Sequence, residues 1–314
     1  MNNQTFKDIV GVKWPIAVMA MNGVSDVKLA VACAKAGILP SLTIFNYYIA
    51  PNTLGLSKIQ NALDEFNALT NNAPLLLSVA VDTIINDSVF QLLLDCKVKV
   101  LEVIFDAPDE VTQSDERDKK RDERIAVLKS HGVILFTKAL DVGDVENLNI
   151  DGIILKGPDA AGRTRNLENS GGSLVDRIKI CKELYPQLHI IASGGVGTSA
   201  QIQECLDAGA VAVGLGTIFA AAEECAISTE TKLKMVGATA NDVTRLKKGA
   251  KQNALIFKEV DTDVNNNTRG LMAGIKSPNS GHVFAGKGIE HIKSIRPVQE
   301  IVNDLTKDLV QHGI

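Results

Sequence analysis

The chain has 314 residues, of which 45% are hydrophobic and 22% charged, and its formal net charge is −4. This apolar content offsets the entropy cost of ordering the chain, which excludes an intrinsically disordered protein. The acidic balance argues against a nucleic-acid or anionic-membrane surface, since both need a basic face. The aromatic content of 4% argues against a stacking platform for single-stranded nucleic acid. No apolar run approaches the roughly 18 residues of a membrane span. The N-terminus lacks the features of a secretion signal, so we predict a cytoplasmic protein.

Short apolar runs alternate with helical patterns along most of the chain. They predict strands at 15–20, 38–44, 74–81, 98–105, 133–140, 152–157, 189–194 and 211–216. Helical patterns lie at 26–36, 56–69, 87–97, 115–130, 142–148, 173–184, 198–210 and 293–309. Eight strands alternating with helices over about 230 residues predict an α/β fold, a (β/α)₈ TIM barrel.

The strands are continuous apolar runs, as expected for a parallel sheet that is covered on both faces. A doubly wound sheet is the alternative fold, but MAMNGVS after the first strand is not the GxGxxG turn that such a sheet uses for dinucleotides. Residues 237–290 are polar and rich in glycine, which predicts a small insertion or lid subdomain near the C-terminus. The barrel would then comprise residues 1–236 and 291–314.

Two further patterns predict structural roles. The cysteines form no CxxC pair and lie in apolar contexts, which favours buried thiols over disulfides or a zinc site; they are Cys33, Cys96, Cys181, Cys205 and Cys225. The charged run from Asp115 to Arg124 mixes both signs, which is typical of a solvated helix face.

Glycine-rich turns follow the last two strands. Ser193-Gly194-Gly195 comes after the seventh strand, and Gly214-Leu215-Gly216-Thr217 comes after the eighth. Glycines let the backbone approach a ligand closely, and exposed amides near a helix N-terminus favour a phosphate. Barrels often hold a phosphate at these two strand ends. The turns therefore predict a phosphate-binding site.

Motifs along nearly the whole chain resemble the nitronate monooxygenase family of FMN-dependent barrels, which is related to FMN-dependent enoyl-ACP reductases. The motifs are PIAVMAMNGVSDVKLAVACAKAG, FDAP, KGPDAAGR, ASGGV, GLGTIFAAAEE and AGKGIEHIKSIRPVQEIV. Each is weak by itself, but their order and their positions at the strand ends fit the superfamily.

The resemblance implies an FMN cofactor and names residues for it. The backbone of Ala20, Met21 and Asn22 would face the flavin ring, Ser78 stands where the family usually has asparagine, and Ala161 would border the flavin pocket. Lys156 would stabilise the negative charge of reduced flavin. The phosphate would lie against Ser193, Gly194, Gly195, Gly214, Leu215, Gly216 and Thr217.

The chain departs from the family at its catalytic histidine. The family run Glu-Ala-Gly-Gly-His reads Asp159-Ala160-Ala161-Gly162-Arg163 here. Arginine stays protonated, so Arg163 cannot act as the base that deprotonates a neutral nitroalkane. No other histidine replaces it: His131 and His189 are expected at the amino ends of strands, His291 and His312 at the surface, and His282 in a solvated loop.

These observations predict an enzyme, an FMN-dependent oxidoreductase that oxidises an anionic, nitronate-like substrate with O2. Arg163 would bind the anion and Lys156 would tune the flavin. The alternative is an FMN-dependent enoyl-ACP or enoyl-thioester reductase with NAD(P)H as reductant. A phosphate-binding isomerase or lyase without flavin, and a non-catalytic ligand-binding relative, stay open. We expect a small-molecule or thioester-linked substrate and no metal; the oligomeric state is open.

Overall fold

The computed structural model describes residues 4–50, 53–96, 98–105, 115–140, 142–145, 148–165, 172–248, 252–257, 274–279 and 281–309. For residues 115, 144, 163–165, 245–248 and 252–257 it describes the backbone alone. His312, the FDAP turn beyond Phe105 and residues 258–273 of the predicted insertion lie outside the described residues.

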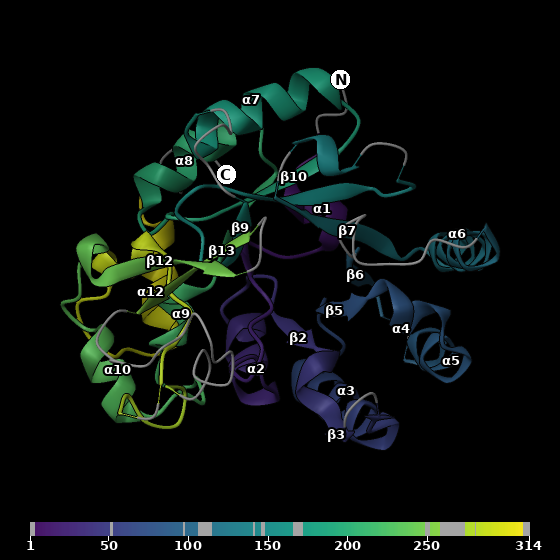
Figure 1. Cartoon of the computed structure of the whole chain (residues 1–314), viewed down its shortest axis with the longest axis horizontal. Helices are drawn as coiled ribbons and strands as arrows, with labels where there is room; N and C mark the ends of the chain where they lie inside the picture. Colours follow the sequence, from purple (N-terminus) through teal and green to yellow (C-terminus); the bar gives the residue numbers. More distant parts are fainter. Residues whose placement is uncertain are drawn as a thin grey trace.

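Eight parallel strands form one sheet in the order β1-β11-β10-β8-β7-β6-β5-β2. They are β1 (Ile16–Val18), β2 (Ser41–Thr43), β5 (Leu76–Ala80), β6 (Val100–Ile104), β7 (Ile134–Ala139), β8 (Gly152–Lys156), β10 (His189–Ser193) and β11 (Ala212–Leu215). Figure 1 shows the strands at the centre of the molecule, with β2, β5, β6, β7 and β10 labelled. A parallel bridge between Ala17 and Leu39 joins β1 to the β2 side and closes the ring. The predicted (β/α)₈ barrel is confirmed.

Helices surround the strands (Figure 1). The α-helices are α2 (Val27–Lys35), α3 (Leu56–Thr70), α4 (Val81–Ile85), α5 (Asp87–Asp95), α6 (Asp115–Ser130), α7 (Leu174–Leu184), α8 (Ser199–Asp207), α9 (Thr217–Ala220), α10 (Thr229–Met235) and α12 (Val298–Thr306). The 3-10 turns are η1 (Ile44–Tyr47), η2 (Val142–Val145), η4 (Ala240–Asp242) and η5 (Lys287–His291). Among the described residues, no helix is both long enough and apolar enough to cross a membrane.

Two helix predictions were wrong in their extent. The described part of the 142–148 segment is the 3-10 turn η2, and Gly143 within it disfavours a regular helix. The last helix begins at Val298 rather than at residue 293, because Pro297 biases the residue before it away from helical backbone angles.

The short helix α1 (Phe6–Val10), which the sequence patterns did not predict, packs against the interior of the barrel. It begins with a capping box in which Thr5 and Asp8 satisfy each other's backbone amides. Its Phe6 and Val10 join one apolar cluster with barrel residues that include Leu76. The other members on the strands or beside their ends are Ala17, Met19, Leu39, Val100, Phe136, Ile154, Ile191 and Ala212.

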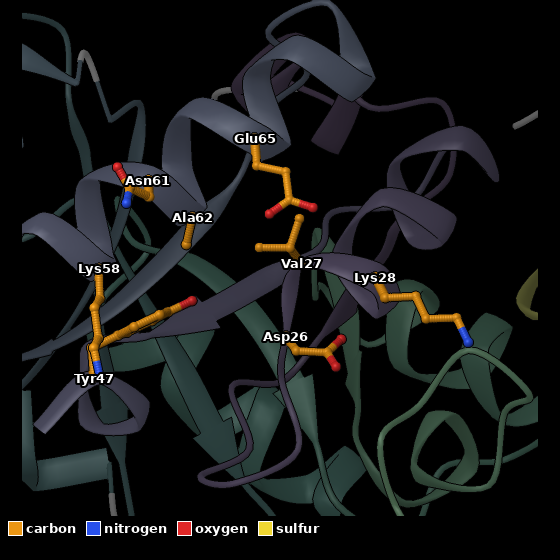
Figure 2. A pocket seen from close by; sticks show the side chains of 8 residues that line it. All are labelled: Asp26, Val27, Lys28, Tyr47, Lys58, Asn61, Ala62 and Glu65. Carbon is orange, nitrogen blue, oxygen red and sulfur yellow. The ribbon is translucent and has the colours of Figure 1, made fainter. Parts of the chain in front are cut away.

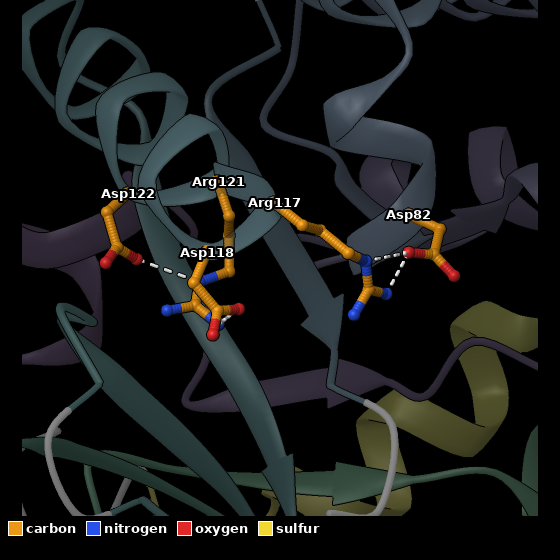
Figure 3. Close-up of polar contacts among 5 residues, drawn as sticks. All are labelled: Asp82, Arg117, Asp118, Arg121 and Asp122. Atoms are coloured by element: carbon orange, nitrogen blue, oxygen red, sulfur yellow. Dashed lines mark hydrogen bonds and ion pairs between the residues drawn. The ribbon is translucent and has the colours of Figure 1, made fainter. Parts of the chain in front are cut away.

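The charged run lies on the exposed face of helix α6, as predicted, and its arginines also form ion pairs. Arg117 pairs with Asp82 of α4, and Arg121 bonds to Asp118 and Asp122 on its own helix (Figure 3). One turn on, the Arg124 guanidinium donates to the Ile84 carbonyl oxygen at 2.6 Å and pairs with Asp87. It also stacks over the Phe90 ring, 4.7 Å from the ring centroid.

We expect Arg124→Met to lower the free energy of unfolding by about 1–3 kcal/mol, because it leaves the Ile84 carbonyl oxygen without its charged donor. Asp87 is exposed and keeps Lys120 as a partner at 3.1 Å, so it adds little to the loss. The Arg124 side chain is only 11% exposed, so solvent replaces this donor poorly. Urea unfolding measures the change. Lys119→Met is the control: its side chain is 78% exposed and lies 4.0 Å from Glu123, so the loss should stay below about 0.5 kcal/mol. Equal losses in both variants would contradict this account.

The cysteines are free thiols, and all but Cys96 are buried. Desolvation raises the pKa of Cys181 and of Cys205 to about 11, so few of these thiols ionise at neutral pH. Cys96 is partly exposed, and its thiol donates to Gln60 Oε1 at 3.2 Å.

We therefore expect a disulfide reagent to modify about one thiol per native chain within minutes and all five after unfolding. Desolvation raises the pKa of Cys96 as well, so the difference rests on access of the reagent to this partly exposed thiol. Cys96→Ser should abolish the native reaction. Rapid modification of that variant would contradict the placement of the four buried thiols.

Candidate active site at the carboxyl ends of the strands

Polar side chains face the interior of the barrel near the carboxyl ends of its strands. Side chains two positions apart on a strand point to the same face. Several polar residues lie two positions after a member of the interior apolar cluster, namely Ser41, Ser78, Glu102, Lys138, Lys156 and Ser193. Register supports this placement, since Ser78 lies opposite Glu102 and Lys156 lies opposite Ser193. The interior is thus apolar at its centre and polar toward its mouth.

The turn after β10 needs glycine for two reasons. Gly194 and Gly195 have φ angles of +121° and +79°, a backbone region that residues other than glycine rarely adopt. A Cβ on Gly194 would lie 2.8 Å from the Ala160 Cβ, and one on Gly195 would lie 2.8 Å from the Asp159 Cβ. The loop after β8 therefore lies directly against this turn. Thr198 caps helix α8 beyond it by accepting a hydrogen bond from the Gln201 amide.

The turn after β11 lies beside the first strand. Gly214 is in register with Ser193 on one side and with Ala17 on the other. A Cβ on Gly214 would be 2.6 Å from the Met19 sulfur, and one on Gly216 would be 3.4 Å from the Met21 sulfur. Leu215 is buried at the end of β11. The predicted phosphate turns and the predicted Met21 region thus lie close together.

The loop after β1 is held by its own hydrogen bonds. The Met21 amide donates to Ser25 Oγ at 2.9 Å, and Ala20 lies between Met21 and the end of β1. Thr43 Oγ1 donates to Asn22 Oδ1 at 3.4 Å, and Thr43 is in register with Ser78 on β5. These contacts connect Asn22 to the side of the barrel where Ser78 lies.

Lys156 ends β8, and its ammonium donates to the Ala161 carbonyl oxygen at 2.7 Å. Strand β9 (Gly162–Arg165) begins directly after Ala161. It pairs with β13 (Gln252–Phe257), and β13 pairs in turn with β12 (Val243–Lys248) (Figure 1). Arg163 lies opposite Ala254 in this three-stranded sheet. The strand that carries Arg163 is therefore joined to a hairpin of the 237–290 segment. The structure describes only the backbone of Arg163, so the role of its side chain stays a prediction.

The segment before η5 contacts the candidate site, which the sequence analysis missed. The Gly286 amide donates to Thr217 Oγ1 at 3.0 Å, at the start of α9. The Lys287 amide donates to the Asp159 carbonyl oxygen at 3.1 Å, and its ammonium lies 2.6 Å from Asp159 Oδ1. These contacts connect the loop after β8 to the turn after β11.

Two histidine predictions were wrong. His282 is 2% exposed rather than solvated, and its carbonyl oxygen accepts from the Gly274 amide. His291 is not a free surface residue, because a Cβ on Gly197 would come within 2.2 Å of its ring. His291 therefore packs on the turn between β10 and α8.

Glu102 and Lys138 are charged residues of the barrel interior that the sequence analysis also missed. Lys138 Nζ lies 2.8 Å from Glu102 Oε1. The available signal was a single charged residue within each of the apolar runs VLEVIF and LFTKAL. This signal does not by itself say to which face of the strand the residue belongs.

A separate groove lies between α2 and α3 (Figure 2). Its volume is about 420 Å³, and it is lined by Asp26, Val27, Lys28, Tyr47, Lys58, Asn61, Ala62 and Glu65. Two lysines and two acidic residues balance its charge, and none of the predicted site residues lines it. The groove therefore offers no specific recognition of an anion.

In (β/α)₈ barrel enzymes the active site lies at the carboxyl ends of the strands, and the predicted site residues described above lie at that end. The chain matches the nitronate monooxygenase family over residues 3–308 and belongs to that family. It is an oxidoreductase, which argues against the isomerase, lyase and non-catalytic alternatives.

Known proteins with similar sequence or fold include several enzymes. A 5-hydroxy-7a-methyl-1-oxo-octahydro-1H-indene-4-carboxyl-CoA dehydrogenase from Rhodococcus jostii is 23% identical over 290 residues, covering 89% of this chain and 73% of that protein. The solved structure of FabK from Thermotoga maritima is 18% identical with a TM-score of 0.78, covering 99% of this chain and 97% of that one. Nitroalkane oxidase from Streptomyces ansochromogenes is 20% identical with a TM-score of 0.74, covering 97% and 98%.

Proposed function

We propose that the chain is an FMN-dependent oxidoreductase that binds the cofactor at the carboxyl ends of the strands. The family supports a flavin, and the structure offers residues that fit one. When bound, the flavin supplies the redox chemistry that no amino-acid side chain provides. Gly194 and Gly195 let the turn after β10 pack directly against the loop after β8, and Gly214 and Gly216 do the same against the loop after β1. The backbone amides of these turns, beside Thr217, would bind the phosphate.

Lys156 would stabilise negative charge that develops on the cofactor. Its ammonium is already anchored to the Ala161 carbonyl oxygen, so little side-chain entropy is lost when a ligand arrives. The backbone of Ala20, Met21 and Asn22 and the Ser78 hydroxyl would border the ring. Gly286 and Lys287, bonded to Thr217 and Asp159, would hold the two loops in place around the cofactor.

The substrate class is inferred from the charge of the three-stranded sheet β12-β13-β9, which follows the carboxyl end of β8. Strands β9, β12 and β13 contain no Asp or Glu and several basic residues, namely Arg163, Arg165, Arg245, Lys247 and Lys248. The chain as a whole has a net charge of −4, so this concentration of positive charge is local. Such a site favours a substrate that arrives as an anion.

We propose a nitronate as that substrate, oxidised with O2 as the electron acceptor. A nitronate has already lost the proton that the family histidine would remove, so Arg163 is compatible with its oxidation. Its planar oxygen pair also matches the parallel N–H donors of a guanidinium.

The second candidate is reduction of an enoyl thioester with NAD(P)H as electron donor. The Rhodococcus relative is named for a CoA thioester, and an enoyl reductase domain from Bacillus amyloliquefaciens shares the fold with a TM-score of 0.71. The basic sheet fits the phosphates of such a carrier. In this reaction one hydride and one proton add across the double bond, and NAD(P)H is oxidised.

Oxygen consumption with a preformed alkyl nitronate, compared with the neutral nitroalkane, tests the proposal. We expect turnover of the nitronate and at least about 100-fold less with the neutral form. Arg163→Met should raise the KM for nitronate about 10- to 100-fold, the loss of one or two charge-assisted hydrogen bonds. Arg117→Met on α6 is the matched control and should leave the KM unchanged. Equal activity on both nitro forms contradicts the anion argument; NAD(P)H oxidation with an enoyl thioester alone would establish the second candidate.

A further inference from the structure

Glu102 is an acidic residue that lies inside the barrel. It sits in the middle of β6, between Leu101 and Val103, and its side chain is 1% exposed. A buried carboxylate is costly unless it is paired. Its charged partner is Lys138 Nζ on the neighbouring strand β7, 2.8 Å from Oε1. Neither carboxylate oxygen meets hydrogen-bond geometry with any described residue.

Lys138 connects this buried acid to the mouth of the barrel. Its side chain is 24% exposed, in contrast to that of Glu102, so the pair extends from the closed interior toward solvent. Lys138 lies two positions after Phe136, and Lys156 lies two positions after Ile154 on the next strand. The two lysines thus occupy adjacent strands on the inner face of the barrel.

The two lysines are held differently. Lys156 bonds to the Ala161 carbonyl oxygen of the loop beyond β8, an uncharged partner. Lys138 is held from within the barrel by the Glu102 carboxylate, which also neutralises it. Apolar residues of similar volume often stabilise a core as well as a buried ion pair does. Packing alone therefore gives little reason for a charged pair at this depth.

We propose that Glu102 is a positioning residue for the cofactor: it holds the Lys138 ammonium at the inner edge of the FMN site and limits the positive charge there to that of Lys156. The inference rests on the proposed function, since it requires bound FMN. Because reduced flavin is more negative than oxidised flavin, this charge sets the ratio of affinities for the two forms. Glu102 lowers that preference for the reduced form, and Lys138 raises it.

The test measures the reduction potential of the FMN-loaded enzyme and the dissociation constant of FMN in three variants. Glu102→Gln should favour the reduced cofactor by about 10-fold, a rise of about 30 mV for a two-electron couple. Lys138→Met should shift the potential by a similar amount in the opposite direction. The double variant Glu102→Gln/Lys138→Met should return close to the wild-type potential, since it removes one charge of each sign. It also keeps the test available if Lys138→Met alone does not fold.

Lys129→Met is the matched control. Lys129 is paired with Asp151 at 2.9 Å, immediately before β8 and therefore at the amino end of the barrel. The flavin reduction potential of the Lys129→Met enzyme should equal that of the wild type, even if its free energy of unfolding changes.

The two proposals fail in different ways. If the wild type binds FMN and neither Glu102→Gln nor Lys138→Met moves the potential, the pair is only structural and this inference is overturned. The same holds if both variants shift the potential in one direction. If the wild type binds no FMN under reconstitution, the proposed function fails as well.

Discussion

Replacing Gly194 with alanine is expected to reduce the affinity for FMN by at least about 100-fold, or about 2.7 kcal/mol. The backbone at Gly194 has a φ angle of +121°, where a side chain adds roughly 1–3 kcal/mol of strain. The new Cβ would also lie 2.8 Å from the Ala160 Cβ and 3.0 Å from the Ala160 amide nitrogen. The turn after β10 and the loop after β8 must then separate, and the proposed phosphate site opens. Titration of the apoprotein with FMN, followed by flavin fluorescence, measures the effect.

Gly132→Ala is the control for backbone strain alone. Gly132 has a φ angle of +78°, but no heavy atom of the surroundings lies within 4 Å of an added Cβ. It follows α6 and precedes β7, at the amino end of the barrel. This variant should lose about 1 kcal/mol of stability and bind FMN as the wild type does. If the two alanine variants bind FMN equally well, the turn after β10 does not hold the phosphate.

The second large effect is expected for Lys156→Met, which should lower the flavin reduction potential by roughly 30 mV or more, about 1.4 kcal/mol for a two-electron couple. The physical reason is the loss of a cation that favours the more negative reduced form. Lys156→Arg keeps the charge and should retain most of the potential. Spectroelectrochemical titration of both variants provides the measurement. An unchanged potential in a folded, FMN-loaded Lys156→Met enzyme would remove the assigned role.

The barrel was predictable because each strand is an apolar run with its own local signal. The runs at 98–105 and 189–194 contain β6 and β10, and the observed strands are shorter by one or two residues at their ends. The glycine turns were predictable for the same reason, because Gly194, Gly195 and Gly214 adjoin recognisable strand ends. The structure adds what occupies the space beside them: Ala160, Asp159 and Met19.

The charged pair of the interior was not predictable in the same way. Glu102 and Lys138 are far apart in sequence, and only the strand order β6–β7 and its register bring them together. A single Glu in an apolar run is compatible with either face of a strand until the neighbouring strand is placed. The burial of His282 and the contact between Lys287 and Asp159 likewise depend on how the chain after residue 274 returns to the barrel.

The net charge of the whole chain differs in sign from the local charge of the three-stranded sheet β12-β13-β9. The net charge of −4 excludes a broadly basic surface but says nothing of local clusters. Asp82 pairs with Arg117 of α6 (Figure 3). Asp87 pairs with Lys120 and Arg124 of the same helix. The sheet formed by β9, β12 and β13 carries basic residues without acidic ones. This local asymmetry supports an anionic substrate despite the acidic chain.

The flavin content of the reconstituted protein tests the central claim most directly. The apoprotein is incubated with excess FMN, passed through a desalting column and denatured, and the released flavin is identified by mass and counted against protein. The account predicts about one FMN per chain for the wild type and for Gly132→Ala, and little for Gly194→Ala. Release of no FMN from the wild type, or the same amount from wild type and Gly194→Ala, would contradict it.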